Sequence, residues 1–175
     1  MTILDQPHRV LFSESQIEER VSALGEAISR DYQGEELLLI GILRGTVFFM
    51  ADLMRAITVP HRIDFMAISS YGQTSETSGV VRIMKDLEES IEGRNVLLVE
   101  DIIDTGLTLH YILRQLRAQR PASLEVCTLL DKRAHRLVEI FPKYVGFTIE
   151  DQFVIGYGLD EYQLYRNLPY IAVLT

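Results

Sequence analysis

Residues 96–108 read VLLVEDIIDTGLT, and this stretch indicates both the fold and the place of a functional site. Its first four residues are all apolar, which is typical of a central strand that is buried on both faces of a parallel sheet. Two acidic residues, Glu100 and Asp101, end the apolar run, and Gly106 then leads into a segment with helical spacing. A strand followed by a glycine turn and a helix predicts an α/β unit, and ligands commonly bind at the end of such a strand.

Apolar runs on either side of this stretch predict the remaining strands and helices. Strands are expected at residues 37–43, 63–68, 80–84, 124–130 and 145–149, with a last strand-like run at 170–175. Helices are expected after a capping box that begins at Ser13, across residues 47–57, and from Gly106 to near Pro121. Because strands alternate with helices, we predict an α/β fold with a parallel sheet of about five strands flanked by helices.

The composition predicts a single globular domain and restricts its partners. Lys and Arg number 17 and Asp and Glu number 25, so the formal net charge is −8. This charge disfavours nucleic acid, and it requires placed cations or amides to receive a polyphosphate. Apolar runs are too short to span a membrane and no signal peptide is evident, so we expect a cytoplasmic protein without a membrane partner. The single cysteine, Cys127, excludes an internal disulfide and a cysteine-based zinc cluster.

The acidic and hydroxyl side chains after the strand are predicted to form a sugar-phosphate site. Gly106 opens a helix whose free amides can approach a phosphate, and Thr105 and Thr108 flank it with hydroxyl groups. Carboxylates close by can accept hydrogen bonds from sugar hydroxyls or bind a divalent cation. Helix capping by Asp104 and Thr105 is the simplest alternative, but it does not account for three acidic residues within five positions.

The same thirteen residues closely resemble the phosphoribosyl pyrophosphate signature of type I phosphoribosyltransferases, and EDIIDTG resembles their hypoxanthine-guanine branch in particular. The resemblance extends from about residue 10 to residue 175, through ILRG (42–45), SSYG (69–72), LLDKR (129–133) and DQFVIGYGLDEYQLYRNLPYI (151–171). It implies the type I phosphoribosyltransferase fold, as one domain over residues 1–175. In such a domain we expect a core at about 10–150, a small hood mainly from 151–175 with the N-terminal segment, and a mobile loop at about 70–82.

The resemblance also implies an activity. The chain is expected to be a Mg²⁺-dependent pentosyltransferase of purine salvage. It would transfer the phosphoribosyl group from 5-phosphoribosyl 1-pyrophosphate to N9 of hypoxanthine or guanine, giving IMP or GMP and pyrophosphate. Its partners would then be small molecules rather than nucleic acid, and the family suggests a homodimer or a homotetramer.

The functional residues of the family map onto matching positions of this sequence. Asp104 is expected to be the general acid/base near N7 of the purine, because attack by N9 requires the base to lose a proton. The residues expected to bind phosphoribosyl pyrophosphate are Glu100, Asp101, Thr105, Gly106, Leu107 and Thr108. Those expected to contact its pyrophosphate are Arg44, Gly45, Ser70, Tyr71 and Arg166, and those expected to hold metal are Glu100, Asp101 and Asp160. Relatives carry a cis peptide before the residue that matches Arg44, and the sequence does not decide the isomer here.

The purine is expected to bind Lys132, Phe153 and Val154. Lys132 resembles the lysine that contacts the 6-oxo group, Phe153 would stack on the base, and Val154 would meet the edge of the base through backbone atoms. Two positions depart from the simplest pattern. Leu107 stands where some relatives carry lysine, and Asp131 puts a negative charge beside Lys132, although alternation along a strand can point it away.

Three other functions match parts of the pattern. A receiver-type signalling domain also combines acidic residues, threonine and lysine at strand ends, but its acidic pair should follow the first strand. A nucleotide- and RNA-binding regulator of the same fold should have a basic surface, which a net charge of −8 does not favour. An enzyme of the same family for adenine, xanthine or a pyrimidine is the third alternative. The sequence does not decide among hypoxanthine, guanine and xanthine.

Overall fold

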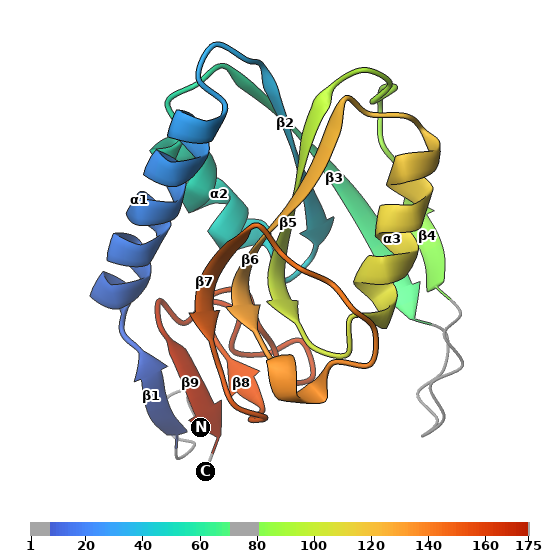
Figure 1. Cartoon of the computed structure of the whole chain (residues 1–175). Helices are drawn as coiled ribbons and strands as arrows, with labels where there is room; N and C mark the ends of the chain where they lie inside the picture. Colours follow the sequence, from blue (N-terminus) through green and yellow to red (C-terminus); the bar gives the residue numbers. More distant parts are fainter. Residues whose placement is uncertain (1–7, 71–80, 175) are drawn as a thin grey trace.

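The computed structural model describes residues 8–70 and 81–174, and its main element is a six-stranded sheet with the order β4-β3-β2-β5-β6-β7 (Figure 1). The strands of this sheet are β2 (Leu37–Leu43), β3 (His61–Ser70), β4 (Val81–Lys85), β5 (Asn95–Ile103), β6 (Ser123–Asp131) and β7 (Tyr144–Thr148). The helices are α1 (Glu14–Asp31), α2 (Val47–Ala56) and α3 (Leu107–Ala118), with a short 3₁₀ turn at Arg133–His135. A second sheet consists of β1 (His8–Phe12), β8 (Val154–Ile155) and β9 (Ile171–Leu174).

The central sheet confirms the predicted α/β fold. Strands β3, β2, β5, β6 and β7 run parallel to their neighbours, whereas β4 at one edge pairs antiparallel with β3. Strand β2 has β3 on one side and β5 on the other, so the strand order reverses between β2 and β5. Open parallel sheets bind ligands beyond the carboxyl ends of the strands at such a reversal. The topology therefore places a candidate site at the ends of β2 and β5.

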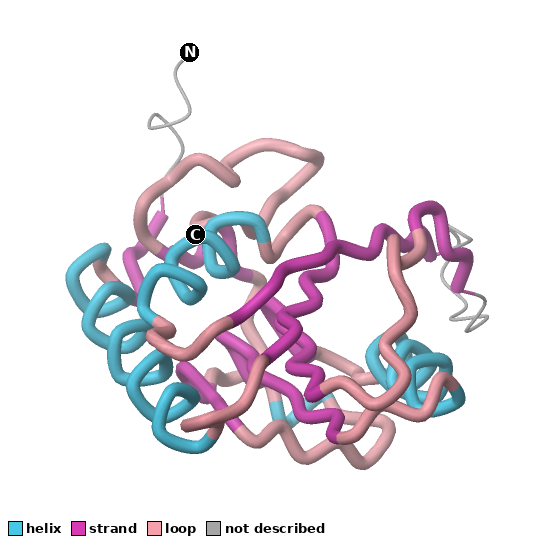
Figure 2. The backbone as a smooth tube through the Cα atoms, turned by 90° about the horizontal axis from the view of Figure 1, so that it is seen from above, coloured by secondary structure: helices cyan, strands magenta, loops and turns pink. Residues whose placement is uncertain are grey.

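Helices cover both faces of the sheet because the central strands are apolar on both faces. Alternate residues of β2 enter different cores: Leu37 and Leu39 pack with α1 and α2, whereas Leu38 and Ile40 pack with α3. Figure 2 shows the same layers from above, with helices on either side of the strands. The two cores fix the positions of the strand ends that carry the candidate site.

The second sheet joins the two ends of the chain. Strand β9 pairs antiparallel with both β1 and β8, and a small core of Ile155, Tyr165, Leu168 and Ala172 supports it. This sheet lies beyond the carboxyl ends of the central strands (Figure 1). The segment between β8 and β9 consequently reaches the place where the strand order reverses.

The strand that carries the acidic pair is longer than predicted. Strand β5 continues to Ile103 because Ile102 and Ile103 still pair with Leu130 and Asp131 of β6. The acidic pair thus lies inside the last part of a strand rather than after it.

The capping box at Ser13 is present as predicted. In residues 8–70 and 81–174, no helix is long and apolar enough to cross a membrane.

The contact between α1 and α2 generates a prediction about stability. A Cβ atom on Gly25 of α1 would lie 2.5 Å from the Ala56 Cβ atom and 2.7 Å from the Ala56 carbonyl oxygen. Gly→Ala normally stabilises a helix by about 1 kcal/mol. Here we expect Gly25→Ala to lower the free energy of unfolding by roughly 1–3 kcal/mol, because the helices must separate. Urea denaturation measures the difference.

Ser22→Ala provides the matched control, since Ser22 is on the exposed side of the same helix. This variant should unfold at the same or a slightly higher urea concentration than the wild type. A Gly25→Ala protein as stable as the Ser22→Ala protein would contradict the packing argument.

Candidate active site

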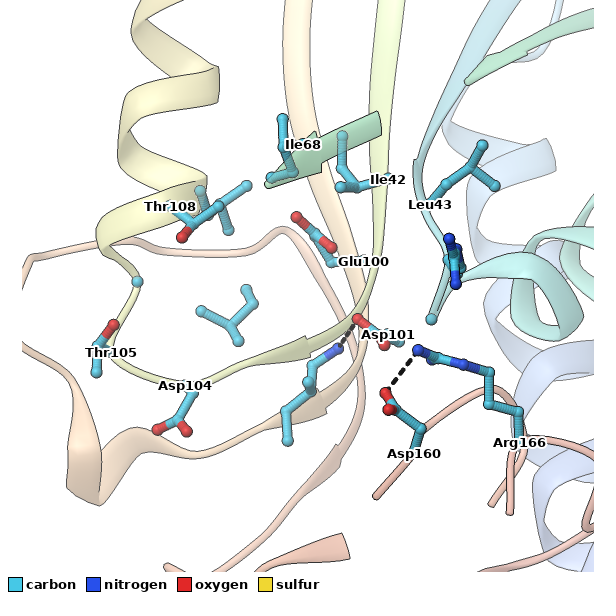
Figure 3. A pocket seen from close by; sticks show the side chains of 16 residues that line it. Ile42, Leu43, Ile68, Glu100, Asp101, Asp104, Thr105, Thr108, Asp160 and Arg166 are labelled. Carbon is cyan, nitrogen blue, oxygen red and sulfur yellow. Dashed lines mark hydrogen bonds and ion pairs between the residues drawn. The ribbon is translucent and has the colours of Figure 1, made fainter. Parts of the chain in front are cut away.

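A cavity of about 490 Å³ opens at the carboxyl ends of β2 and β5. Its walls are formed by the segment after β2, by the end of β5 with the start of α3, and by the segment between β8 and β9 (Figure 3). The charged and hydroxyl side chains that line it are Arg44, Glu100, Asp101, Asp104, Thr105, Thr108, Asp160 and Arg166. Residues from three distant parts of the sequence, all predicted to share one site, therefore meet in one cavity.

The acidic pair of β5 is largely withdrawn from water, because Glu100 is buried and Asp101 is half-buried. Glu100 is only 7% exposed, and burial raises its pKa well above the ordinary value, with the Asp101 charge adding to the shift. Burial also raises the pKa of Asp101 to about 6, although backbone N–H groups and the nearby Arg166 act in the opposite direction. Such carboxylates favour a ligand that brings positive charge or hydrogen-bond donors, namely a divalent cation or sugar hydroxyls.

The loop after β2 approaches Asp101 so closely that residue 45 has room only for glycine. A Cβ atom on Gly45 would overlap the Asp101 carboxylate, and a Cβ atom on Gly158 would overlap the Gly45 carbonyl oxygen. Gly158 also has a φ of 99°, in the region that favours glycine. The peptide bond that precedes Arg44 is cis, which settles the isomer that the sequence left open. The backbone of the loop after β2 thus packs directly against the Asp101 side chain and against Gly158, which lies in the segment between β8 and β9.

Two arginines meet on one side of the cavity, and Gln163 connects them. The Arg44 and Arg166 guanidinium groups each donate a hydrogen bond of 3.0 Å to Gln163 Oε1. Arg166 also donates to the Gly158 carbonyl oxygen at 2.6 Å and forms an ion pair of 2.7 Å with Asp160. A neighbouring cavity of about 500 Å³ shares both arginines with the first. Gln163 was not among the predicted site residues, because it lies in an irregular turn that carries no periodic pattern.

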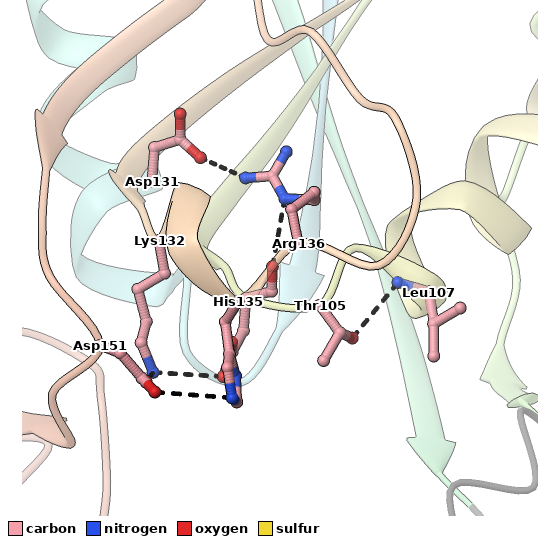
Figure 4. A network of polar contacts seen from close by, with 8 residues as sticks. Thr105, Leu107, Asp131, Lys132, His135, Arg136 and Asp151 are labelled. Atoms are coloured by element: carbon pink, nitrogen blue, oxygen red, sulfur yellow. Dashed lines mark hydrogen bonds and ion pairs between the residues drawn. The ribbon is translucent and has the colours of Figure 1, made fainter.

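Asp104 contacts two cationic or hydrogen-bonding side chains, one of them unexpected. Its Oδ2 atom lies 3.4 Å from Lys132 Nζ, and its Oδ1 atom lies 2.8 Å from His135 Nδ1. Figure 4 labels both of these partners. Lys132 is buried, and its Nζ atom is also 3.1 Å from Asp151 Oδ1. The proposed general base and the proposed purine-reading lysine are therefore neighbours. Sequence analysis did not single out His135 or Asp151, since no ligand-like spacing marks either residue.

The negative charge of Asp131 is directed away from Lys132. The Asp131 carboxylate pairs with Arg133 at 2.8 Å and with Arg136, and it is almost completely buried. Arg136 Nε also donates to the Asp104 carbonyl oxygen at 3.2 Å. Alternation along β6 has thus separated the two neighbouring charges, as the sequence allowed (Figure 4).

The start of α3 has the form expected of a phosphate-binding loop. Gly106 is the N-cap residue with a left-handed conformation, and Thr105 Oγ1 accepts a weak 3.4 Å hydrogen bond from the Leu107 N–H group. The first amides of a helix have no partner within the helix and favour anions. Leu107 adds no charge to this loop, so backbone amides and hydroxyl groups have to provide the contacts.

The structure describes the residues predicted to bind the purine but only a small part of the predicted mobile loop. Phe153 is 58% exposed just before β8, and Val154 begins that strand and is buried. An exposed aromatic ring offers a face for stacking. Ser70 ends β3, whereas Tyr71 and most of the loop expected at about 70–82 lie outside the described residues.

The acidic residues fit Mg²⁺ better than a metal held by protein alone. Among the described residues, no group of three or more His, Cys, Asp or Glu side chains could hold a metal ion. Glu100 and Asp101 instead offer two neighbouring carboxylates in the cavity, and Asp160 offers a third that is paired with Arg166. Mg²⁺ typically binds one or two carboxylates together with waters and substrate phosphates.

The raised pKa of Asp101 predicts a cost in stability. A carboxyl group whose pKa rises from 3.8 to about 6 on folding destabilises the folded state progressively as the pH increases from about 4 to 6. We therefore expect Asp101→Asn to raise the free energy of unfolding at pH 7 by roughly 1–2 kcal/mol in the absence of ligand. The variant should also lose less stability than the wild type between pH 4 and pH 6, as measured by urea denaturation at each pH.

Asp64→Asn is the matched control for this experiment. Burial tends to raise the pKa of Asp64, but hydrogen bonds from the Glu88 and Phe65 N–H groups and from Lys85 lower it overall. Removing that charge should lower the stability at pH 7. A loss of stability in Asp101→Asn as well would contradict the proposed cost of the acidic pair.

Comparisons with known proteins identify the family of this chain. Residues 11–162 match the family model described as the phosphoribosyl transferase domain. The hypoxanthine-guanine phosphoribosyltransferase of Mycobacterium tuberculosis (strain ATCC 25618 / H37Rv) is 51% identical over 94% of this chain and 85% of its own length, and that of Bacillus subtilis (strain 168) is 48% identical over 95% and 92%. A crystal structure of a hypoxanthine-guanine phosphoribosyltransferase from Bacillus anthracis has a TM-score of 0.92 and 47% identity, covering 95% of this chain and 98% of that one. The chain belongs to the phosphoribosyl transferase domain family.

Proposed function

We infer that this chain is a purine phosphoribosyltransferase of the hypoxanthine-guanine type. It transfers the phosphoribosyl group of 5-phosphoribosyl 1-pyrophosphate to N9 of hypoxanthine or guanine and produces IMP or GMP and pyrophosphate. Close relatives carry that name. One observation supports the proposal: the cavity that holds the acidic pair continues to Asp104, which contacts the buried Lys132, so a sugar phosphate and a 6-oxo base would bind side by side.

The phosphoribosyl half of the substrate is assigned to β5 and the start of α3. Thr105, Gly106, Leu107 and Thr108 would bind the 5′-phosphate through hydroxyl and amide groups at the helix N-terminus. Glu100 and Asp101 would accept hydrogen bonds from the ribose hydroxyls. The raised pKa values of both acids support this assignment, because donors from the sugar would stabilise the ionised carboxylates.

Pyrophosphate is assigned to the arginine side of the cavity. Arg44, Gly45 and Arg166 would contact it, with Ser70 and Tyr71 contributing from the end of β3 and from the loop outside the described residues. Glu100, Asp101 and Asp160 would hold Mg²⁺, which supplies positive charge to the leaving pyrophosphate. Gln163 Oε1 accepts a hydrogen bond from each of the two guanidinium groups, and the pyrophosphate would replace Gln163 as their acceptor.

The purine is assigned to the side of the cavity where Asp104 and Lys132 meet. Lys132 would donate to the 6-oxo group, and a 6-amino group would leave this buried donor unpaired, which discriminates strongly against adenine. As the bond from N9 to C1′ forms and the bond from C1′ to pyrophosphate breaks, Asp104 would accept the proton that the base loses. Phe153 would stack on the ring, and Val154 would contact its edge through the backbone.

Several expectations stay predictions. A mobile loop at about 70–82 would exclude water from the reacting carbon, and a hood mainly from residues 151–175 would cover a core at about 10–150. A homodimer or homotetramer, a cytoplasmic location, and the absence of nucleic acid and membrane partners are likewise predicted.

A direct assay tests the activity and its base specificity. Purified protein, Mg²⁺ and phosphoribosyl pyrophosphate are mixed separately with hypoxanthine, guanine, xanthine and adenine, and nucleotide formation is followed. We expect product with hypoxanthine or guanine, none with adenine, and none when the metal is chelated. Product with xanthine alone would assign the chain to a different branch of the family. If no 6-oxopurine gave product, the proposed phosphoribosyltransferase activity would be refuted.

The role of Asp104 is testable in the same assay. Asp104→Asn keeps the size of the side chain but cannot accept the purine proton, so we expect kcat to fall by roughly 10²–10⁴-fold. Binding of phosphoribosyl pyrophosphate should be nearly unchanged. Asp151→Asn removes a carboxylate that contacts the same Lys132 and His135 side chains and should cost far less. Equal losses in the two variants would indicate that charge near Lys132, rather than proton transfer, is what matters.

A further inference from the structure

Four side chains form a closed ring of contacts beside the cavity, and Figure 4 labels three of them: Lys132, His135 and Asp151. Asp104 and Asp151 alternate with Lys132 and His135, and each carboxylate uses one oxygen for the lysine and the other for the histidine. Asp104 Oδ2 lies 3.4 Å from Lys132 Nζ and Asp104 Oδ1 lies 2.8 Å from His135 Nδ1. Asp151 Oδ1 lies 3.1 Å from the lysine, and Asp151 Oδ2 lies 3.5 Å from His135 Nε2.

The contact between His135 and Asp104 is the shortest in this ring. An ionised carboxylate accepts but cannot donate, so the short contact requires that Nδ1 of the imidazole carries a hydrogen. The longer separation on the Nε2 side makes the contact to Asp151 the weaker of the two. His135 is therefore oriented mainly by Asp104, and Asp104 in turn has one oxygen fixed by His135.

Both partners of this contact are supported by the backbone. His135 ends the 3₁₀ turn that follows β6, and its N–H group donates to the Lys132 carbonyl oxygen at 3.3 Å. Arg136, the next residue, donates to the Asp104 carbonyl oxygen and pairs with the buried Asp131. The turn that carries His135 is thus attached to the backbone of the residue that its side chain contacts.

Binding of a 6-oxopurine should break the contact between Lys132 and Asp104 and leave the contact between His135 and Asp104 in place. A 6-oxo group competes for the Lys132 ammonium group, which then no longer occupies Asp104 Oδ2. That oxygen becomes available to the purine proton, while Oδ1 stays bonded to His135. The two oxygens of the general base would in this way have separate tasks.

We propose that His135 is a positioning residue for Asp104: its Nδ1–H group fixes one carboxylate oxygen so that the other accepts the proton of the purine. This inference rests on the proposed function. The competing explanation is an ordinary surface contact, because the His135 and Asp104 side chains are 53% and 45% exposed and such pairs commonly contribute little. The two explanations predict different kinetics.

Two substitutions of nearly equal size test the hydrogen bond. His135→Leu removes the donor, whereas the Asn side chain of His135→Asn places an amide N–H group close to the former Nδ1 position. We expect His135→Leu to lower kcat roughly tenfold or more, the usual effect of losing a hydrogen bond to a charged group, with KM for phosphoribosyl pyrophosphate unchanged. His135→Asn should recover most of the activity. His110→Leu, on the exposed side of α3, is the matched control and should behave like the wild type.

A double-mutant cycle connects the effect to Asp104. In an Asp104→Asn background, where no general base is left to orient, His135→Leu should change kcat by less than about twofold. A full additional loss in that background, a kcat of His135→Leu close to that of the wild type, or equal losses in the Leu and Asn variants would each overturn the proposal. An increase in KM for the purine with unchanged kcat would also overturn it. Failure of the wild type to form IMP or GMP would instead refute the proposed function.

Discussion

The rest of the site depends on two carboxylates that the fold withdraws from water at the end of its central strand. Ionised groups in such a position are costly unless a cation or hydrogen-bond donors approach them. Glu100 and Asp101 are held there because β5 pairs with β6 beyond the acidic pair and because the loop after β2 closes against Asp101. In the proposed function, a divalent cation or the hydroxyl groups of the sugar would approach these carboxylates and stabilise their ionised forms.

The same constraint explains how an acidic chain can bind a polyanion. Its cations are few near the cavity, and each is already held by a polar partner. Arg166 is paired with Asp160, Arg44 is bonded to Gln163, and Lys132 lies between two carboxylates. These partners keep the long side chains in defined positions, so in the proposed function a phosphate or a 6-oxo group would replace a local partner instead of ordering a free side chain. Binding would then cost less conformational entropy, which offsets part of the repulsion that a net charge of −8 exerts on a polyanion.

The sequence was sufficient to predict the structure where periodicity or a local motif determines it. The apolar runs predicted the parallel strands, and the sequence around Gly106 predicted the start of α3. It failed where partners come from irregular segments: Gln163 has a positive φ in a turn, and His135 belongs to a single 3₁₀ turn. Neither has a spacing that a linear pattern could reveal, because their contacts depend on how the chain end and the turn after β6 are docked. The end of β5 was also missed, since pairing with β6 overrides the low strand propensity of acidic residues.

The position of Asp104 follows from how these segments meet. Strands β5 and β6 end side by side, and the Lys132 N–H group donates to the Ile103 carbonyl oxygen at 3.0 Å. Asp104 is the first residue after β5 and Lys132 is the first residue after β6, and their side chains contact each other. In the proposed reaction, a proton acceptor has to reach the purine while the acidic pair of the same strand would hold the ribose. Asp104 would meet both conditions because it lies at the junction of the two strand ends, where it contacts Lys132 and His135.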